Sequence, residues 1–173
     1  MAPMISIVGY ADAGKTTLIE KLVPELKNRG YRVGTIKHAV HESNLDTQGK
    51  DSWRHFAAGA DTVVVSSAEK IALIQKRETA PKDSQSELES LETYFSGMDV
   101  IFAEGYKNAR KPKIEIFRST IHDAPLSIND KMLVALVTDA DIQCSVPKFG
   151  LDEIAKLADL IERVFLKDKK TGV

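Results

Sequence analysis

The sequence has a single cysteine, almost no net charge and no long apolar run. Its single cysteine, Cys144, excludes an internal disulfide framework and a cysteine-rich metal site. Its 24 basic and 25 acidic residues leave a formal net charge of -1, so no general electrostatic attraction to nucleic acid is expected. No apolar run approaches the roughly 18 residues that a membrane-spanning helix needs. These absences favour a protein that binds neither nucleic acid nor membrane.

The composition is that of an ordinary globular chain. Hydrophobic residues make up 43% of the 173 positions and charged residues 28%. Residues 1–6 lack the basic region, apolar stretch and cleavage site of a secretory signal peptide, so we expect a cytoplasmic location. Because no long linker interrupts the chain, we expect a single domain over residues 1–173.

Strand-like apolar runs alternate with segments of helical period along the chain. This alternation favours βαβ units and a largely parallel sheet. The predicted strands cover residues 5–8, 33–37, 62–66, 71–74, 99–103, 113–117 and 132–138. The predicted helices begin near residue 16, cover 51–59, surround residues 88–95 and close the chain over 151–165. The polar stretch 38–50 is expected to be a loop.

A phosphate-binding loop follows the first predicted strand. Residues 9–16, GYADAGKT, match the pattern G-x-x-x-x-G-K-[ST] at every fixed position. Glycines let successive backbone N–H groups wrap a phosphate, and the next helix directs its free N–H groups to the same point. Lys15 then reaches the β- and γ-phosphates and the Thr16 hydroxyl ligates Mg²⁺. The sequence therefore predicts a nucleotide-binding protein.

The fold class predicted from these features is α/β. We expect a three-layer P-loop NTPase fold with a mostly parallel central sheet flanked by helices, plus a small antiparallel extension. The predicted nucleotide contacts are Gly9, Ala11, Asp12, Ala13, Gly14, Lys15, Thr16 and Thr17. Asp12 is unusual among them, because a carboxylate inside an anion-binding loop has to point to solvent or meet a cation or a partner.

Acidic residues at strand ends are candidate metal ligands. Magnesium prefers few protein carboxylates together with water and phosphate oxygens. Glu104 directly follows the predicted strand 100–103 and is the first candidate. Asp46, in the polar stretch, is the second, and it could instead orient an attacking water. Asp51 lies a few residues further along the chain. Asp46 and Asp51 could each equally be a solvated loop residue.

Several basic residues are weaker candidates. Lys37 and Arg54 could add positive charge to the phosphate site. His38 and His41 resemble a metal pair only superficially, because three-residue spacing in a loop is weak evidence for zinc. A basic cluster after Glu104 could receive a second anionic ligand or form a solvated turn. This cluster comprises Lys107, Arg110, Lys111 and Lys113.

Beyond the phosphate loop, the chain resembles a known family, the molybdopterin-guanine dinucleotide biosynthesis protein B (MobB) family. The resemblance rests on GYADAGKTTL, TIKHAVH, LDTQGKDSWRHFAAGAD, DVIFAEGYKNARKPKIEIFR and LVALVTD. It implies a P-loop fold of the signal-recognition and MinD type, GTP with Mg²⁺, slow GTP hydrolysis and a homodimer. It also implies cooperation with the guanylyltransferase of molybdenum cofactor synthesis, and it makes molybdopterin a candidate ligand.

The resemblance also carries over residue roles. It implies that Gly9, Gly14 and Lys15–Thr17 contact phosphate and Mg²⁺. It further implies that Asp46 and Glu104 bind the metal or position water, so that Lys15, Asp46 and Glu104 form the catalytic set.

Alternatives to this function remain open. No Asn-Lys-x-Asp motif reads guanine, so GTP follows from the resemblance, and Thr138 and Asp139 are the candidate strand end for base contacts. A small-molecule kinase would use the same loop to phosphorylate an acceptor near residues 107–113. A nucleotide-dependent adapter would bind without turnover. A nickel-insertion GTPase is set aside because it would need a Cys/His cluster.

Overall fold

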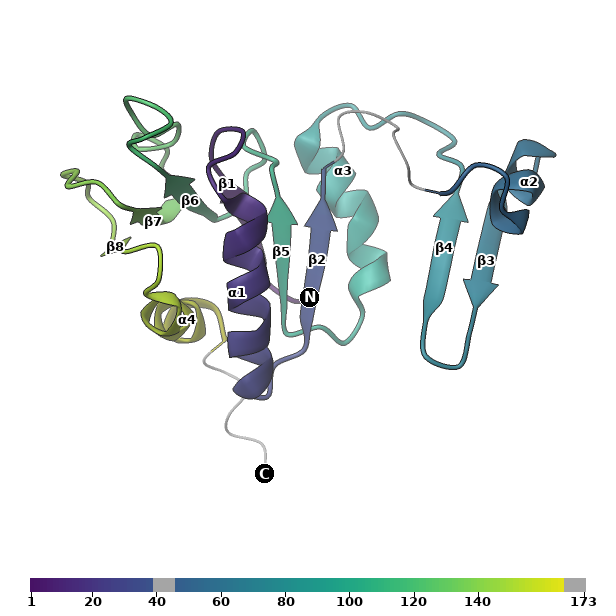
Figure 1. Cartoon of the computed structure of the whole chain (residues 1–173), viewed down its shortest axis with the longest axis horizontal. Helices are drawn as coiled ribbons and strands as arrows, with labels where there is room; N and C mark the ends of the chain where they lie inside the picture. The colour runs from purple at the N-terminus through teal and green to yellow at the C-terminus, as the bar shows by residue number, and fades with distance from the viewer. Residues whose placement is uncertain (39–45, 167–173) are drawn as a thin grey trace. The chain divides into compact units, whose positions relative to one another are not determined.

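The computed structural model of the chain describes residues 1–38 and 46–166. Contacts divide the chain into two compact units, and each has its own sheet (Figure 1). The main unit consists of Met1–His38 and Lys82–Val173, and the hairpin unit is Ala39–Pro81. A single domain over 1–173 stays a prediction. Among the described helices, none has the length and apolarity that a membrane crossing requires.

The main unit is built around a parallel sheet. Within the described residues it has six strands in the order β2-β5-β1-β6-β7-β8, and every neighbouring pair is parallel. The strands are β1 (Met4–Val8), β2 (Val33–Lys37), β5 (Val100–Glu104), β6 (Lys113–Phe117), β7 (Leu133–Thr138) and β8 (Lys148–Phe149). The predicted α/β fold with a mostly parallel sheet is confirmed.

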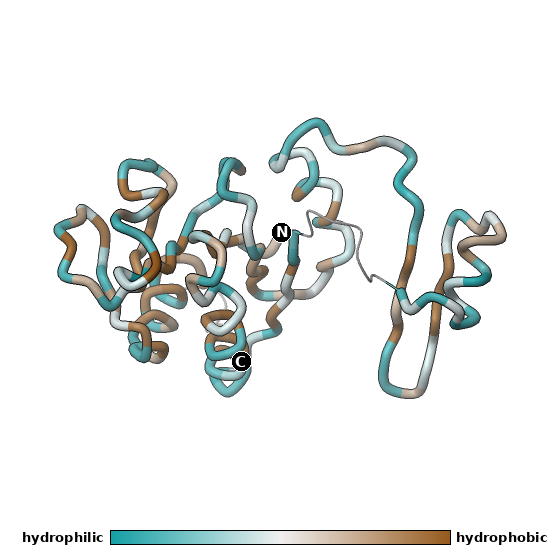
Figure 2. The backbone as a smooth tube through the Cα atoms, turned by 45° about the horizontal axis from the view of Figure 1, so that its top comes forward, coloured by the Kyte–Doolittle hydropathy of each residue, from teal (hydrophilic) through white to brown (hydrophobic). Residues whose placement is uncertain are grey.

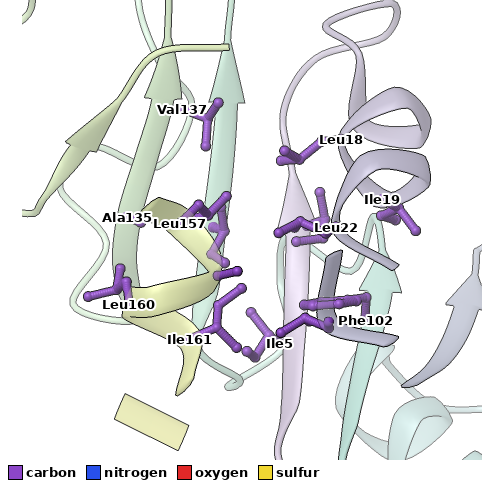
Figure 3. Close-up of a cluster of buried hydrophobic side chains, with 14 of the residues drawn as sticks. Ile5, Leu18, Ile19, Leu22, Phe102, Ala135, Val137, Leu157, Leu160 and Ile161 are labelled. Atoms are coloured by element: carbon purple, nitrogen blue, oxygen red, sulfur yellow. The ribbon is translucent and has the colours of Figure 1, made fainter. Parts of the chain in front are cut away.

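Apolar side chains alternate between the two faces of this sheet. Val100 and Phe102 of β5 join the cluster beneath α1 (Lys15–Asn28) and α4 (Ile154–Ile161). Figure 3 shows this cluster, with Leu18 and Leu22 of α1 and Leu157 and Ile161 of α4 among its labelled side chains. Because successive residues of a strand point to opposite faces, an unbroken apolar strand is buried on both sides.

The opposite face is covered by α3 (Ser84–Leu91) and the 3₁₀ turn η1 (Glu92–Phe95). Leu88 is fully buried there, in one cluster with Ile101 of β5. The helix begins in a capping box, in which the Asp83 carboxylate accepts from the backbone N–H of Ser86 and the Ser86 hydroxyl accepts from the N–H of Asp83. The predicted three layers of helix, sheet and helix are therefore confirmed.

The hairpin unit contains α2 (Asp51–Ala57) and the antiparallel pair β3 (Thr62–Ser66) and β4 (Ile71–Gln75). This confirms the predicted antiparallel extension. Apolar residues run along both strands (Figure 2). Four of them are exposed by 44% or more, namely Val64, Val65, Ile71 and Leu73.

Two local features differ from the predictions. The closing helix is shorter than residues 151–165, because α4 ends at Ile161 and a π-helical turn, Glu162–Leu166, follows it. The two-residue strand β8 was not predicted, since two residues show no alternation. Residues 39–45 of the expected loop lie outside the described part of the chain.

Candidate nucleotide-binding site

The phosphate loop connects β1 to α1 at the edge where the parallel strands end (Figure 1). β1 lies between β5 and β6 in the sheet; the chain continues from β1 to β2 on one side, whereas it continues from β6 to β7 on the other. Ligands of open α/β sheets bind in the crevice beyond the carboxyl ends of such strands. The topology therefore places residues 9–16 where a nucleotide is expected.

The backbone of the loop passes unusually close to the neighbouring strand. A Cβ atom on Gly9, whose φ is +147°, would lie 2.4 Å from the carbonyl oxygen of Ile116 in β6. Gly14 is the N-cap of α1, and its carbonyl accepts the first helical hydrogen bond from Leu18 at 2.9 Å. The first turn of α1 contains no acidic residue, so its positive end stays available to an anion.

Lys15 folds back over the loop. Its Nζ donates to the carbonyl oxygens of Gly9 at 3.1 Å and Tyr10 at 2.6 Å. These bonds hold the ammonium group beside the backbone that would surround a phosphate. A triphosphate would find the positive charge in place and would need little rearrangement of the side chain.

Thr16 and Glu104 meet across the site. The Thr16 hydroxyl lies 3.0 Å from both carboxylate oxygens of Glu104 and donates to them. Lys37 Nζ lies 3.8 Å from the same carboxylate, because its strand position pairs with Glu104 in register. A hydroxyl and a carboxylate are the hard oxygen donors that Mg²⁺ prefers, so this pair fits the expected metal.

The remaining loop residues differ in exposure. Ala13 is buried against the sheet, whereas Ala11, Asp12 and Thr17 are exposed. Asp12 has a positive φ of 59°, an uncommon conformation for a residue other than glycine. Its exposure agrees with the expectation that a carboxylate in this loop points to solvent.

Asp46 belongs to the hairpin unit. Its Oδ1 accepts from the Thr47 N–H at 2.7 Å and from the Ser52 hydroxyl at 3.2 Å. Its Oδ2 is buried without a hydrogen-bond partner among the described residues. In the same unit, Asp51 and Arg54 form an exposed ion pair at 3.7 Å. That Asp46 binds the metal or positions water stays a prediction.

Two lysines of the predicted basic cluster are already paired. Lys113 is buried and contacts Asp130 at 2.9 Å, and its Nζ also donates to the Ala109 carbonyl. Lys111 contacts Glu92 at 2.9 Å. A second anion site built on all four basic residues is therefore not supported. Lys107 and Arg110 are exposed.

The structure describes only one residue of the candidate histidine pair. His38 Nδ1 lies 3.3 Å from the Glu87 carboxylate, and its ring contacts that of Tyr106. His41 lies outside the described residues. Within the described residues, no group of three or more His, Cys, Asp or Glu side chains is arranged to hold a metal ion.

The predicted base-contacting strand end is held by its own neighbours. The Asp139 carboxylate accepts from the backbone N–H of Ser119 at 2.9 Å and from its hydroxyl at 3.2 Å. The backbone hydrogen bond from Ser119 holds the pKa of Asp139 below its usual value. Thr138 is buried and accepts from the Ala140 N–H.

The sequence reasoning missed one contact at the loop itself. Tyr10, the second loop residue, stacks on His122, with ring centroids 3.6 Å apart. The signal was the aromatic residue at a position where small residues are usual. No sequence pattern indicated its partner.

The chain is similar in sequence to known proteins. Residues 4–139 match the family model of "Molybdopterin guanine dinucleotide synthesis protein B" (MobB). The chain is 34% identical over 160 residues to a "Molybdopterin-guanine dinucleotide biosynthesis adapter protein" of Haemophilus influenzae, covering 92% of this chain and 88% of that protein. It is 32% identical over 164 residues to the Escherichia coli protein of the same name, covering 93% and 92%.

The fold is also similar to that of a solved structure. The crystal structure of Bacillus subtilis MobB superposes with a TM-score of 0.71 at 28% sequence identity. The superposition covers 93% of this chain and 96% of that one. The sequence similarity to the two adapter proteins and the structural similarity to this protein therefore each extend over nearly the whole chain.

Proposed function

Because the chain belongs to the molybdopterin guanine dinucleotide synthesis protein B family, we propose that it is a GTP-binding adapter protein of molybdopterin guanine dinucleotide formation. It hydrolyses GTP slowly, requires Mg²⁺ and acts in the cytoplasm. The observation that carries the nucleotide part is the juxtaposition of Lys15, Thr16 and Glu104 at the N-terminus of α1.

Each of these residues has a separate task in the proposal. Lys15 neutralises the β- and γ-phosphates, while the first turn of α1 binds them through its N–H groups. Thr16 and Glu104 hold Mg²⁺, directly or through water, once the metal replaces the hydrogen bond between them. The bound metal supplies charge stabilisation at the phosphates. Asp46 is the proposed residue for positioning water or completing the metal site.

The adapter part rests on the relatives. The similar proteins from Haemophilus influenzae and Escherichia coli are named adapter proteins of this biosynthesis. We therefore propose that the partner is the guanylyltransferase of molybdenum cofactor synthesis, with molybdopterin as a candidate ligand. We further propose a homodimer, because Val64, Ile71 and Leu73 are exposed on one face of the β3–β4 pair and an exposed apolar face commonly marks an interface.

Equilibrium titration of GTP, ATP and their diphosphates, with and without Mg²⁺, tests the nucleotide part. The matched variants are Lys15→Ala and Lys21→Ala, since Lys21 lies on the same helix and forms an ion pair with the exposed Asp152 carboxylate. We expect Lys15→Ala to bind at least about tenfold more weakly, because it loses charge-assisted hydrogen bonds to phosphate. Lys21→Ala should bind like the unmodified protein.

Phosphate release measured alongside binding separates the candidate activities. Preference for GTP with slow release supports the proposal. Preference for ATP, with release only after a small acceptor is added, indicates a kinase instead. Binding that survives unchanged in Lys15→Ala contradicts the phosphate site. For catalysis, Asp46→Ala should slow release, whereas Asp51→Ala should leave it unchanged.

A further inference from the structure

The ring of Tyr10 is held by a residue from another part of the main unit. It stacks on the imidazole of His122, with a centroid separation of 3.6 Å and an angle of 26° between the planes. His122 lies in the connection between β6 and β7. Because β6 is parallel to β1, this connection leaves β6 at the edge of the sheet where the phosphate loop leaves β1 (Figure 1). Stacked rings attract each other beyond their buried area, so the contact fixes the direction of the Tyr10 side chain.

That direction matters because Tyr10 is part of the phosphate cradle. Its carbonyl, together with that of Gly9, accepts a hydrogen bond from Lys15 Nζ. A loop of this kind closes around a phosphate at hydrogen-bonding distance from its backbone. A phenol ring folded over the mouth of the loop would occupy volume that the phosphates need. The stack holds the ring against His122 of the connection between β6 and β7.

The segment that carries His122 is itself anchored on both sides of the imidazole. Before it, the Ser119 N–H and hydroxyl donate to Asp139 at the end of β7. After it, the Leu126 and Ser127 N–H groups donate to the buried Glu115 carboxylate at 2.6 and 2.8 Å. Since these bonds tie the segment to two strands, His122 is presented to Tyr10 from a supported position.

We propose that His122 is a positioning residue of the phosphate loop. By stacking on Tyr10 it holds the ring outside the phosphate cavity, and this makes a loop with an aromatic second residue able to accept a nucleoside triphosphate. The inference rests on the proposed nucleotide binding. It assigns His122 no contact with the nucleotide, so its effect must depend on the presence of the tyrosine ring.

This dependence provides the test. Calorimetric titration of Mg²⁺-GTP is compared in four proteins: unmodified, His122→Ala, Tyr10→Ser and the double variant. We expect His122→Ala to weaken binding by about three- to tenfold, which corresponds to the loss of one stacked pair. In the Tyr10→Ser background the same change should alter affinity by less than about twofold. His122→Phe, which retains a stacking ring, should bind like the unmodified protein.

The outcomes separate the two proposals. If the unmodified protein does not bind Mg²⁺-GTP, the proposed function fails. If it binds and His122→Ala weakens binding equally in both backgrounds, the positioning role is overturned. Binding by His122→Phe that is as weak as binding by His122→Ala overturns the positioning role as well. Thermal unfolding without nucleotide checks that each variant is folded. If His122→Ala does not fold, His122→Leu takes its place, and the same outcomes support or overturn the positioning role.

Discussion

Replacing Gly9 with alanine should harm the protein more than the same replacement at Gly30. Both glycines have positive φ, +147° at Gly9 and +90° at Gly30. A Cβ on Gly30 would meet no heavy atom of the described residues within 4 Å beyond its chain neighbours. A Cβ on Gly9 would lie 2.4 Å from the carbonyl oxygen of Ile116. Ile116 cannot easily retreat, because its strand is paired with β1 and β7.

The expected magnitudes follow from this difference. A side chain in a left-handed conformation costs about 1–2 kcal/mol at either position. Forcing an atom into packed structure adds about 1–3 kcal/mol, and only Gly9 incurs this second cost. We therefore expect Gly9→Ala to lower the free energy of unfolding by about 2–5 kcal/mol and Gly30→Ala by about 1–2 kcal/mol.

Urea denaturation followed by circular dichroism measures both variants against the unmodified protein. Nucleotide titration should show that Gly9→Ala also loses binding, because a displaced loop no longer directs its N–H groups at one point. Gly30→Ala, at the far end of α1, should bind normally. Equal losses of unfolding free energy in the two variants would refute the close approach between the loop and β6.

Two further predictions concern stability. Leu22→Ala, at a fully buried position of α1, should lower the free energy of unfolding by about 2–5 kcal/mol. Val164→Ala, at a position that is 52% exposed, should change it by less than about 0.5 kcal/mol, and similar losses in the two variants would contradict the assigned core. Burial raises the pKa of Glu115 above its ordinary 4.5, although hydrogen bonds from Leu126 and Ser127 oppose the shift. Because the folded state then holds its proton more tightly, unmodified protein should lose stability relative to Glu115→Gln as pH rises from about 4.5 toward neutrality. Denaturation at a series of pH values tests this, and an unfolding free energy of the unmodified protein that stays constant or rises relative to that of Glu115→Gln over this range contradicts it.

The phosphate loop and most of the layers could be predicted from the order of the residues alone. The loop was recognisable because phosphate binding uses consecutive backbone N–H groups, so residues 9–16 carry the whole pattern in one stretch. The strands were recognisable because a short, unbroken apolar run such as 100–103 indicates a strand that is buried in the sheet. Both signals are local, and neither depends on which strands become neighbours.

Which distant residues meet depended on the folded sheet. Thr16 meets Glu104, 88 positions away, because β5 pairs with β1 in a particular register. Lys113 had the sequence signature of a surface charge, yet it is buried. Its burial is tolerated because the Asp130 carboxylate, in the connection between β6 and β7, forms an ion pair with it. Tyr10 found its ring partner only once β6 lay beside β1. Such contacts depend on strand order and register, which arise from the packing of the whole sheet and leave no periodic trace in the sequence around each residue.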